Sequence, residues 1–493
     1  MGFSEEKKMK LTEVKIILKE IEDSCNVNLI TINGLKAWPL IRSILWSEFT
    51  KADVQKKSVI GRGYSLIQRT EYLLNKFGLI YLLTKIIPKI ADKKTEVLFI
   101  GRAQHRVRIK GVRKCFDRIM DPLVLLTDSG TVTKSFTLGI PKLRNSYNPT
   151  ERLRVRRSVP ELKILGLEES GLPEYLGQLN VSMDSLWSAV RLGVKAFSKS
   201  YVMGGDLLSK VPNTKRIFLS VWYSLDSLGV IAAAHQRDIQ VIDIQHGGEM
   251  HGMYAGWSCI PENGYELLPD IFWCWGDESA NRIQHGMKKS SKHRTIVGGY
   301  PWQEFRQTKM SESIDKSQLT TPTASSTKVV LFSLQPLSFD VQQRIPDFVL
   351  SFLKLDHSEI HFKFRRHPND PDDKEELRQL RKMKLKTHFE IEDSSADLVS
   401  TISGSNFHIS AFSSVAFECF ALGVPSLLFG EQSKVLYDRE IQEGVFSWTT
   451  GAINDLSKFF EGEIGSKVPH RNYISTSLEL ARDALLEVIH NPN

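Results

Sequence analysis

The sequence predicts an α/β fold with two parallel β-sheets, each covered by helices on both faces. Short apolar runs alternate with helical stretches along the chain, which is typical of strand–helix–strand units in a parallel sheet. The alternation stops at a polar run, residues 307–327, and then restarts. The length of 493 residues is also too great for one ordinary hydrophobic core. We therefore expect two domains, each with its own sheet.

We expect residues 1–92 to form a helical N-terminal extension before the first domain. Apolar residues recur there at near-helical spacing. Residues 93–306 form the predicted N-terminal domain. Its first strand is a short apolar run that ends in glycine, the profile of a buried parallel strand. Helices are expected at residues 10–21, 35–49 and 225–235, and strands at 97–101, 123–126, 216–221, 241–244, 271–275 and 295–297.

The polar run at residues 307–327 is the predicted linker between the domains. Residues 328–475 form the predicted C-terminal domain, and residues 476–493 a C-terminal helix. Strands are expected at 328–333, 361–364, 389–392, 407–410 and 426–429, and helices at 346–353, 372–382, 397–403, 415–422 and 478–489.

The charge balance is basic, with a formal net charge of +8. Cationic residues concentrate in two runs, residues 102–118 and 152–157, and such patches favour anionic partners, unless they are merely solvated faces. We find no nucleic-acid recognition motif and expect no nucleic-acid partner. The five cysteines are odd in number and form no CxxC pair, which argues against a disulfide framework and a zinc site.

Residues 73–94 are strongly apolar and flanked by lysines, as an interfacial membrane helix would be. A buried helix is the alternative. No stretch reaches the roughly 20 apolar residues that span a bilayer, and the polar start of the chain is not a signal peptide. We expect a cytoplasmic protein that binds peripherally to the inner face of the plasma membrane.

A phosphate site is predicted where the helix at residues 415–422 begins. Ser413 and Ser414 lie at its start, where free N–H groups and the positive end of the helix dipole attract phosphate. One turn later, Glu418 is placed to accept hydrogen bonds from a ribose. Arg366 and His367 follow another predicted strand, and their cationic donors also suit a phosphate.

A second group of polar residues follows the predicted strand at residues 241–244. His246 lies in a Gln-His-Gly-Gly turn, whose glycines allow the backbone to approach a ligand closely. Histidine suits a general base near neutral pH. Glu249 is the rival base, because a closed site can raise the pKa of a carboxyl group. His251 and Tyr254 would then shape an acceptor pocket.

Residues after two earlier predicted strands are further acceptor-side candidates. Arg102 and His105 follow the first strand and could contact an anionic acceptor, while Asp128 follows the second. No metal site is expected, because His246 and His251 are five residues apart in a glycine-rich loop and no acidic cluster accompanies them.

These motifs resemble those of GT-B glycosyltransferases, enzymes in which two Rossmann-like domains face a cleft. The segment from Glu418 to Pro425 is similar to that superfamily's Glu-x4-Gly-x-Pro element, which binds the ribose and which sugar-nucleotide epimerases share. His367-Pro368 followed by the serine pair resembles bacterial sialyltransferases. The His246-Gly247 pair resembles CDP-glycerol glycerophosphotransferases and capsule and lipopolysaccharide glycosyltransferases, in which this histidine is a candidate base.

The resemblance implies a metal-independent glycosyltransferase of bacterial surface polysaccharide assembly. It would move a sugar from a nucleotide-activated donor, with a cytidine nucleotide favoured, to a glycan or lipid-linked acceptor. The nucleotide sugar is the substrate, and no cofactor is implied. Three alternatives stay open: a CDP-polyol phosphotransferase of the teichoic-acid type, a sugar-nucleotide epimerase, and a non-catalytic partner in polysaccharide assembly.

Overall fold

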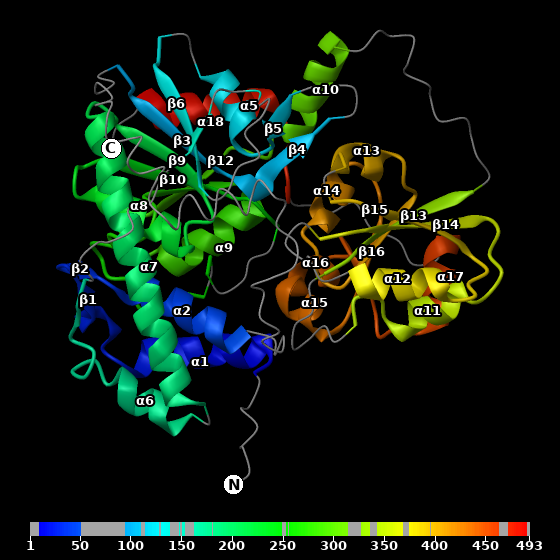
Figure 1. Cartoon of the computed structure of the whole chain (residues 1–493), viewed down its shortest axis with the longest axis horizontal. Helices are drawn as coiled ribbons and strands as arrows, with labels where there is room; N and C mark the ends of the chain where they lie inside the picture. Colours follow the sequence, from blue (N-terminus) through cyan, green and yellow to red (C-terminus); the bar gives the residue numbers. More distant parts are fainter. Residues whose placement is uncertain are drawn as a thin grey trace, which may run out of the picture.

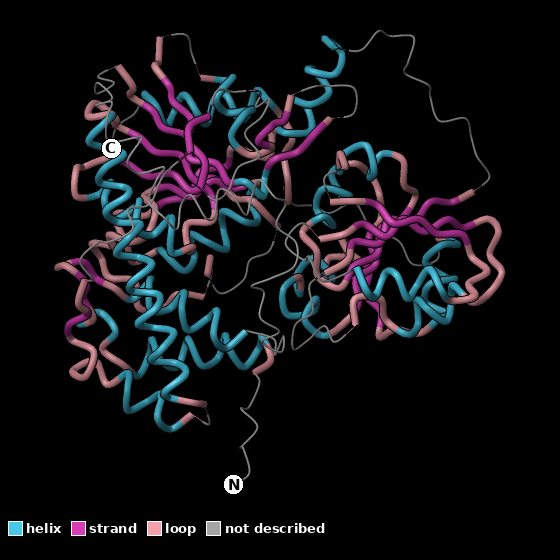
Figure 2. Tube along the Cα trace, in the orientation of Figure 1, coloured by secondary structure: helices cyan, strands magenta, loops and turns pink. Residues whose placement is uncertain are grey.

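The computed structural model describes most of the chain, with several segments left out. The described residues are 9–50, 94–109, 114–127, 130–138, 147, 150–152, 162–179, 181–248, 253–254, 256–313, 327–335, 343–367, 374–394, 396–462 and 472–490. They form two α/β units, each with strands at its centre and helices around them (Figures 1 and 2).

The N-terminal domain is built on a seven-stranded parallel sheet in the order β12-β11-β10-β9-β3-β6-β7. Every residue of β9 and β11 is buried, as expected of central strands covered on both faces. The strands are β3 (Val97–Arg102), β6 (Thr133–Leu138), β7 (Thr150–Arg152), β9 (Arg216–Ser220), β10 (Gln240–Ile244), β11 (Ile271–Cys274) and β12 (Arg294–Val297).

Helices cover this sheet, and two of them pack unusually closely. A Cβ atom on Gly229 of α8 would lie 2.4 Å from the backbone nitrogen of Tyr201 in α7, so only glycine permits this approach. The helices of the domain are α5 (Met120–Leu126), α6 (Leu172–Gln178), α7 (Met183–Lys210), α8 (Leu225–His235), α9 (Asp277–Met287) and α10 (Trp302–Ser313). Short elements complete it: β1 (Thr31–Ile32), β2 (Leu35–Lys36), β4 (Arg106–Arg108), β5 (Cys115–Asp117), β8 (Ile164–Leu165), η1 (Val27–Leu29) and η2 (Ala103–His105).

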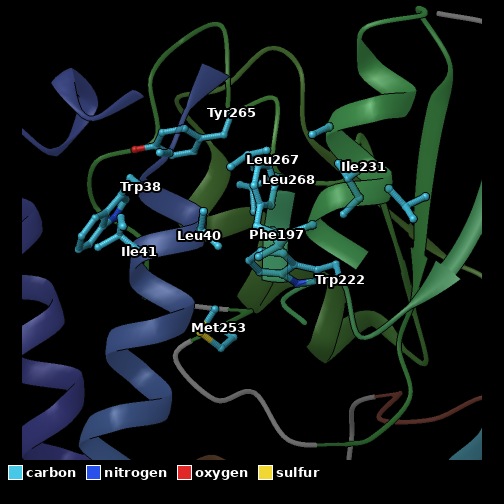
Figure 3. Packing of buried hydrophobic residues seen from close by; sticks show 14 of the residues in the cluster. Trp38, Leu40, Ile41, Phe197, Trp222, Ile231, Met253, Tyr265, Leu267 and Leu268 are labelled. Atoms are coloured by element: carbon cyan, nitrogen blue, oxygen red, sulfur yellow. The ribbon is translucent and has the colours of Figure 1, made fainter. Parts of the chain in front are cut away.

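The two N-terminal helices, α1 (Leu11–Ser24) and α2 (Trp38–Thr50), share one hydrophobic core with the N-terminal domain. Trp38 and Ile41 of α2 belong to the same cluster as Phe197 of α7 and Trp222 after β9 (Figure 3). The described part of the predicted extension is therefore packed into the first domain.

The C-terminal domain has a six-stranded parallel sheet in the order β15-β14-β13-β16-β17-β18. Its strands are β13 (Lys328–Ser333), β14 (Ile360–Arg365), β15 (His388–Glu392), β16 (Phe407–Ser410), β17 (Ser426–Phe429) and β18 (Ser447–Thr449). Its helices are α11 (Asp347–Leu353), α12 (Lys374–Lys382), α13 (Leu398–Ser403), α14 (Val415–Ala421), α15 (Glu431–Leu436), α16 (Asp438–Gln442) and α17 (Ile453–Glu461).

The last helix, α18 (Leu478–His490), crosses back to the N-terminal domain and lies beside α5 (Figure 1). The segment before it adds backbone hydrogen bonds to the same domain, from Tyr300 N to Ser475 O at 2.6 Å and from Ser475 N to Trp275 O at 2.9 Å. A hydrophobic cluster that contains Trp275, Phe417 and Leu485 continues through both domains. The domains are thus joined by an apolar contact as well as by the chain.

Three sequence-based expectations need comment. The strand expected at residues 123–126 is wrong, because these residues lie in helix α5. A short apolar run does not distinguish a strand from a buried helix, and Pro122 in the first turn suits a helix start. Residues 307–313 of the expected linker belong to α10. The apolar segment at 73–94 lies outside the described residues except for Lys94, and among the described helices none is long and apolar enough to cross a membrane.

Candidate functional site

The carboxyl ends of three adjacent strands bring the main polar groups of the N-terminal domain together. Strands β10, β9 and β3 are neighbours and parallel, so the residues that follow them meet at one edge of the sheet, where ligands bind in open α/β sheets. His105 follows β3, Tyr223 follows β9 and His246 follows β10. The rings of His105 and His246 have their centroids 5.8 Å apart.

His246 lies in a chain of hydrogen-bonding groups, which we refer to as the His246 cluster: Asp243, Tyr254, His246 and Tyr223. The Tyr254 hydroxyl lies 2.9 Å from Asp243 Oδ2 and 3.3 Å from His246 Nδ1. The Tyr223 hydroxyl lies 3.4 Å from His246 Nε2. The cluster thus connects a buried carboxyl group to both nitrogens of the imidazole ring.

The protonation state of Asp243 decides which nitrogen of His246 is available as a base. When Asp243 is ionised, Tyr254 donates its single proton to the carboxylate, and the Tyr254 oxygen can accept from His246 Nδ1–H. The lone pair of His246 is then on Nε2. When Asp243 is protonated, the carboxyl group donates to Tyr254, Tyr254 donates to Nδ1, and the imidazole proton moves to Nε2.

Burial governs the charges in this cluster. It raises the pKa of Asp243 to about 8, although hydrogen bonds from Tyr254 and from the Trp222 backbone oppose the rise. Burial, helped by the neighbouring His246, lowers the pKa of His105 well below its usual value. His105 is therefore neutral at physiological pH, with its Nδ1 3.4 Å from Ser220 Oγ.

The end of β9 has a strained backbone beside this cluster. Val221 has a φ of 59°, which is rare for a β-branched residue and is found mostly where surrounding contacts impose it. The contacts here are a 3.1 Å hydrogen bond from Trp222 N to Asp243 Oδ1 and a 3.1 Å bond from Arg102 Nε to Ser220 O. Arg102 also donates to Ser224 and Ser227, so the candidate anion-binding arginine is bound within the protein.

A buried ion pair supports the loop that carries Tyr254. Arg42 of α2 and Glu22 of α1 form a 2.7 Å pair, and the other oxygen of Glu22 accepts a 2.7 Å bond from Ser258 N. The Arg42 guanidinium also lies over the Trp257 ring, 4.1 Å from its centroid. The N-terminal helices therefore fix the loop after β10, a role that the sequence did not predict.

The C-terminal domain contributes residues from the ends of β14 and β16, which flank β13. Arg366 follows β14 and forms a 3.4 Å ion pair with Asp393, and His367 beside it is half-buried. Ser413 is buried, with its Oγ accepting a 3.3 Å bond from Val415 N. Ser414 is half-buried, and its side chain makes no capping bond to α14. The predicted donor-side residues therefore lie at one edge of the second sheet.

The two edges meet directly at Gly248. A Cβ atom on Gly248 would lie 1.9 Å from Phe417 Cδ2, so the Gln-His-Gly-Gly turn packs against α14 of the other domain. The sequence predicted that these glycines allow close approach to a ligand. In the structure, the close neighbour that requires glycine at position 248 is Phe417.

Glu418 also lies at this domain boundary. It is 2% exposed, and its Oε1 forms a 3.2 Å ion pair with Arg118 Nη1 from the N-terminal domain. Burial raises the pKa of Glu418, while the charges of Arg118 and Arg365 oppose that rise. Arg118 belongs to the basic run at residues 102–118, so a second cation of that run is used inside the protein.

Asp128, Glu249 and His251 lie outside the described residues, and their predicted roles stay predictions. In the part of the chain that the structure describes, no group of three or more His, Cys, Asp or Glu side chains is placed to hold a metal ion.

Asp243, Tyr223 and Arg118 were not predicted as site residues. Asp243 has a usable signal, because it is an acid inside the apolar run Val-Ile-Asp-Ile, and a buried acid in a strand needs a partner. Arg118 has no such signal, because its partner Glu418 is 300 residues away in sequence.

No protein-family model and no curated protein sequence matches this chain. Solved structures do match its fold. A UDP-GlcNAc 2-epimerase from Neisseria meningitidis, bound to UDP-GlcNAc, is 14% identical with a TM-score of 0.51, over 80% of this chain and 100% of that one. A UDP-GlcNAc 2-epimerase from Methanocaldococcus jannaschii, in complex with UDP-GlcNAc and UDP, is 11% identical with a TM-score of 0.52, over 80% and 100%. The predicted fold is confirmed as an α/β fold of the GT-B-like type.

Proposed function

We propose that this chain is an enzyme that acts on a nucleotide-activated sugar and breaks the bond between the anomeric carbon and the phosphate oxygen. The observation that supports this most is the contact of Gly248, two residues after His246, with Phe417 of the helix that carries Glu418. A base candidate of one domain thereby lies beside the predicted nucleotide site of the other. The ligands in the two epimerase structures, UDP-GlcNAc and UDP, are of the same chemical class.

The C-terminal edge would bind the nucleotide. His367, the Ser413 hydroxyl and the Ser414 hydroxyl and N–H groups would stabilise the negative charge that develops on the phosphate as the electron pair of the anomeric C–O bond moves to it. Arg366 would add a cationic donor. Glu418 would bind the ribose. These roles are favoured by the position of all five residues beyond the carboxyl ends of β14 and β16.

The N-terminal edge would carry the proton chemistry. His246 Nε2 is a base when Asp243 is ionised and Tyr254 accepts from Nδ1–H, as the hydrogen-bond geometry allows. The raised pKa of Asp243 means that this state is favoured at pH values above about 8. Asp243 is then a positioning residue, because it acts on the substrate only through Tyr254 and His246.

Epimerisation of the sugar is the first candidate reaction. It is favoured by the two solved structures, both of which are UDP-GlcNAc 2-epimerases. Inversion at C2 requires that the C2–H bond breaks and re-forms. If the nucleotide leaves C1 as the C2 proton is removed, which gives a C1=C2 double bond, it must add back to C1 when a proton returns to the opposite face of C2. A base that removes this proton exchanges it with solvent, so deuterium from D2O would enter the sugar at C2.

Glycosyl transfer is the second candidate, favoured by the order of the His367, Ser413–Ser414 and Glu418 motifs and by a histidine, His246, whose Nε2 carries the lone pair when Asp243 is ionised. His246 would remove the proton of an acceptor hydroxyl, whose oxygen would then attack the anomeric carbon. A cytidine donor, a surface-polysaccharide or lipid-linked acceptor and attachment to the inner face of the membrane remain parts of this proposal.

The two reactions are separated by incubating the protein in D2O with UDP-GlcNAc and with cytidine-activated sugars, and following each by proton NMR. Loss of the C2 proton signal without an acceptor supports epimerisation. Release of free nucleotide that depends on an added glycan or lipid-linked acceptor supports transfer. If every donor stays intact with every acceptor and no nucleotide binds, the proposed function is wrong.

A further inference from the structure

Buried oxygens without hydrogen-bond partners gather around Arg118 at the domain boundary. Arg118 follows β5, Tyr300 precedes α10, and Glu418 lies in α14 of the other domain. Glu418 and Tyr300 are 2% and 3% exposed. Among the described residues, Glu418 Oε2 and Asp117 Oδ2 have no hydrogen-bond partner, while the Tyr300 hydroxyl interacts with the Arg118 guanidinium.

Such an arrangement is costly unless a ligand or water completes it, because buried polar atoms are almost always hydrogen-bonded. The two oxygens of the Glu418 carboxylate differ in their contacts. Oε1 pairs with Arg118 Nη1 at 3.2 Å, while Oε2 has no hydrogen-bond partner among the described groups. The helix is also fixed from the N-terminal domain by Gln303 Nε2, 3.4 Å from the Glu418 backbone oxygen. One carboxylate oxygen is therefore held in place and the other is left to accept a hydrogen bond.

We infer that Arg118 is a positioning residue for recognition of the ribose: it holds Glu418 Oε1 so that Oε2 accepts a hydrogen bond from a ribose hydroxyl of the nucleotide. This inference rests on the proposed function. Since Arg118 and Glu418 belong to different domains, ribose recognition depends on the two domains being in contact.

The surrounding charges show what Arg118 does for Glu418. Burial favours the neutral acid, and the cations Arg118 and Arg365 favour the carboxylate. The charged or titratable groups facing this carboxyl group from neighbouring elements are Arg118, Arg365, Asp397 and Tyr300. Without Arg118 the main opposing charge is lost, and Glu418 becomes a poorer acceptor for a ribose hydroxyl.

The test compares the binding of UDP and CDP with that of their 2′,3′-dideoxy counterparts by titration calorimetry. Wild type should bind at least one ribonucleotide about 10- to 100-fold more tightly than its dideoxy form, as expected for a hydrogen bond to a charged group. In Arg118→Gln the ratio of the dideoxy to the ribonucleotide dissociation constant should approach one, while the affinity for the dideoxy nucleotide changes little. A Glu418→Gln variant should lose the same preference, because it removes the charged acceptor directly.

Two further variants control for a structural effect. Arg282→Gln breaks another ion pair between the domains, from Arg282 Nη2 to Glu440 Oε1 at 2.9 Å, and should keep the ribose preference. Arg118→Lys keeps the charge, should fold if Arg118→Gln does not, and should show an intermediate preference because it lacks the planar fork.

The outcomes separate this inference from the proposed function. If Arg118→Gln lowers the affinity for the ribonucleotide and for its dideoxy form equally, Arg118 has only a structural role. Tight nucleotide binding by wild type without any ribose preference would overturn this inference, with water as the partner of Glu418 Oε2, and would leave the proposed function standing. No binding of any nucleotide by wild type would overturn both.

Discussion

The two sheet edges that meet at Gly248 hold their polar groups in different ways. At the N-terminal edge, His246 is contacted on both ring nitrogens by tyrosines, and Asp243 behind them is 1% exposed. At the C-terminal edge, Ser413 Oγ accepts a bond from the nearby Val415 N, and the Ser414 side chain makes no capping bond to α14. A histidine contacted on both ring nitrogens suits proton transfer, which needs fixed geometry, and a hydroxyl group that caps no helix suits contact with a phosphate. In the proposed function, the proton chemistry belongs to the N-terminal domain and nucleotide binding to the C-terminal domain.

The sharpest test of this division is His246→Ala. We expect turnover of the nucleotide sugar to fall by about 10²–10⁴, the range for loss of a general base, with nucleotide affinity unchanged. His285→Ala, which removes an exposed histidine of α9, is the matched control. If His246→Ala turns over its substrate at the wild-type rate, the base is another residue.

Breaking the Arg42–Glu22 pair tests how the N-terminal edge is made rigid. Arg42→Leu leaves a buried carboxylate without its cation and should lower the free energy of unfolding by about 3–5 kcal/mol. Denaturant melts of the full chain measure this. The exposed pair formed by Lys215 and Glu96 is the comparison, since Lys215→Ala should cost about 1 kcal/mol or less. A loss that small for Arg42→Leu would show that α1 and α2 do not stabilise this edge.

His367→Ala tests the binding role of the C-terminal edge. Loss of a hydrogen bond to phosphate should weaken nucleotide affinity by about 10- to 100-fold, as measured by titration calorimetry. The exposed His388 at the start of β15 is the control for substitution, because it is not at the carboxyl edge of the sheet. If His367→Ala keeps its nucleotide affinity but loses turnover, His367 acts in the chemical step and not in nucleotide binding.

The raised pKa of Asp243 predicts a pH-dependent stability. Burial raises this pKa from 3.8 to about 8, so between those values the folded state holds a proton that the unfolded state has released. The free energy of unfolding should therefore fall as pH rises from about 4 to about 8, by at most about 1.4 kcal/mol per pH unit. Asp243→Asn cannot ionise and should lose this contribution. Thermal midpoints of both proteins at pH 5 and pH 7.5 test it, and parallel pH trends would contradict it.

The smallest expected effect is at the start of α8, beside the same edge. Ser224 Oγ accepts a 3.2 Å bond from Ser227 N at the N-terminus of this helix and also accepts from Arg102. Ser224→Ala should lower the free energy of unfolding by about 1–2 kcal/mol. Ser182→Ala removes a similar cap at α7, where Ser182 Oγ accepts from Ser185 N at 3.3 Å, without touching an arginine. A cost at Ser224 no greater than at Ser182 would show that the Arg102 bond adds no stability.

Sequence patterns predicted the fold well because both sheets are parallel and buried. Strands such as β11 and β13 contain continuous apolar runs, and helix α8 was predicted with its observed limits. The failure at residues 123–126 has a physical cause, since a run as short as Leu-Val-Leu-Leu fits either a strand or a buried helix.

The candidate site was predictable only where it depends on local sequence. His246, His367 and the Ser413–Ser414 pair follow strands, and strand ends are visible in the sequence. The pairing of Arg118 with Glu418 and the hydrogen bond between Tyr254 and Asp243 depend on how distant elements pack. No periodicity or spacing encodes such contacts.

The return of α18 to the N-terminal domain has a consequence for synthesis. Domains generally fold in order as the chain leaves the ribosome. Here, Leu485 and Val488 belong to the buried cluster that contains Val97 and Phe99 of β3, so the first domain to emerge cannot bury that surface until the last residues have been made. The residues of the C-terminal domain are therefore made before the N-terminal domain has the helix that completes its buried surface.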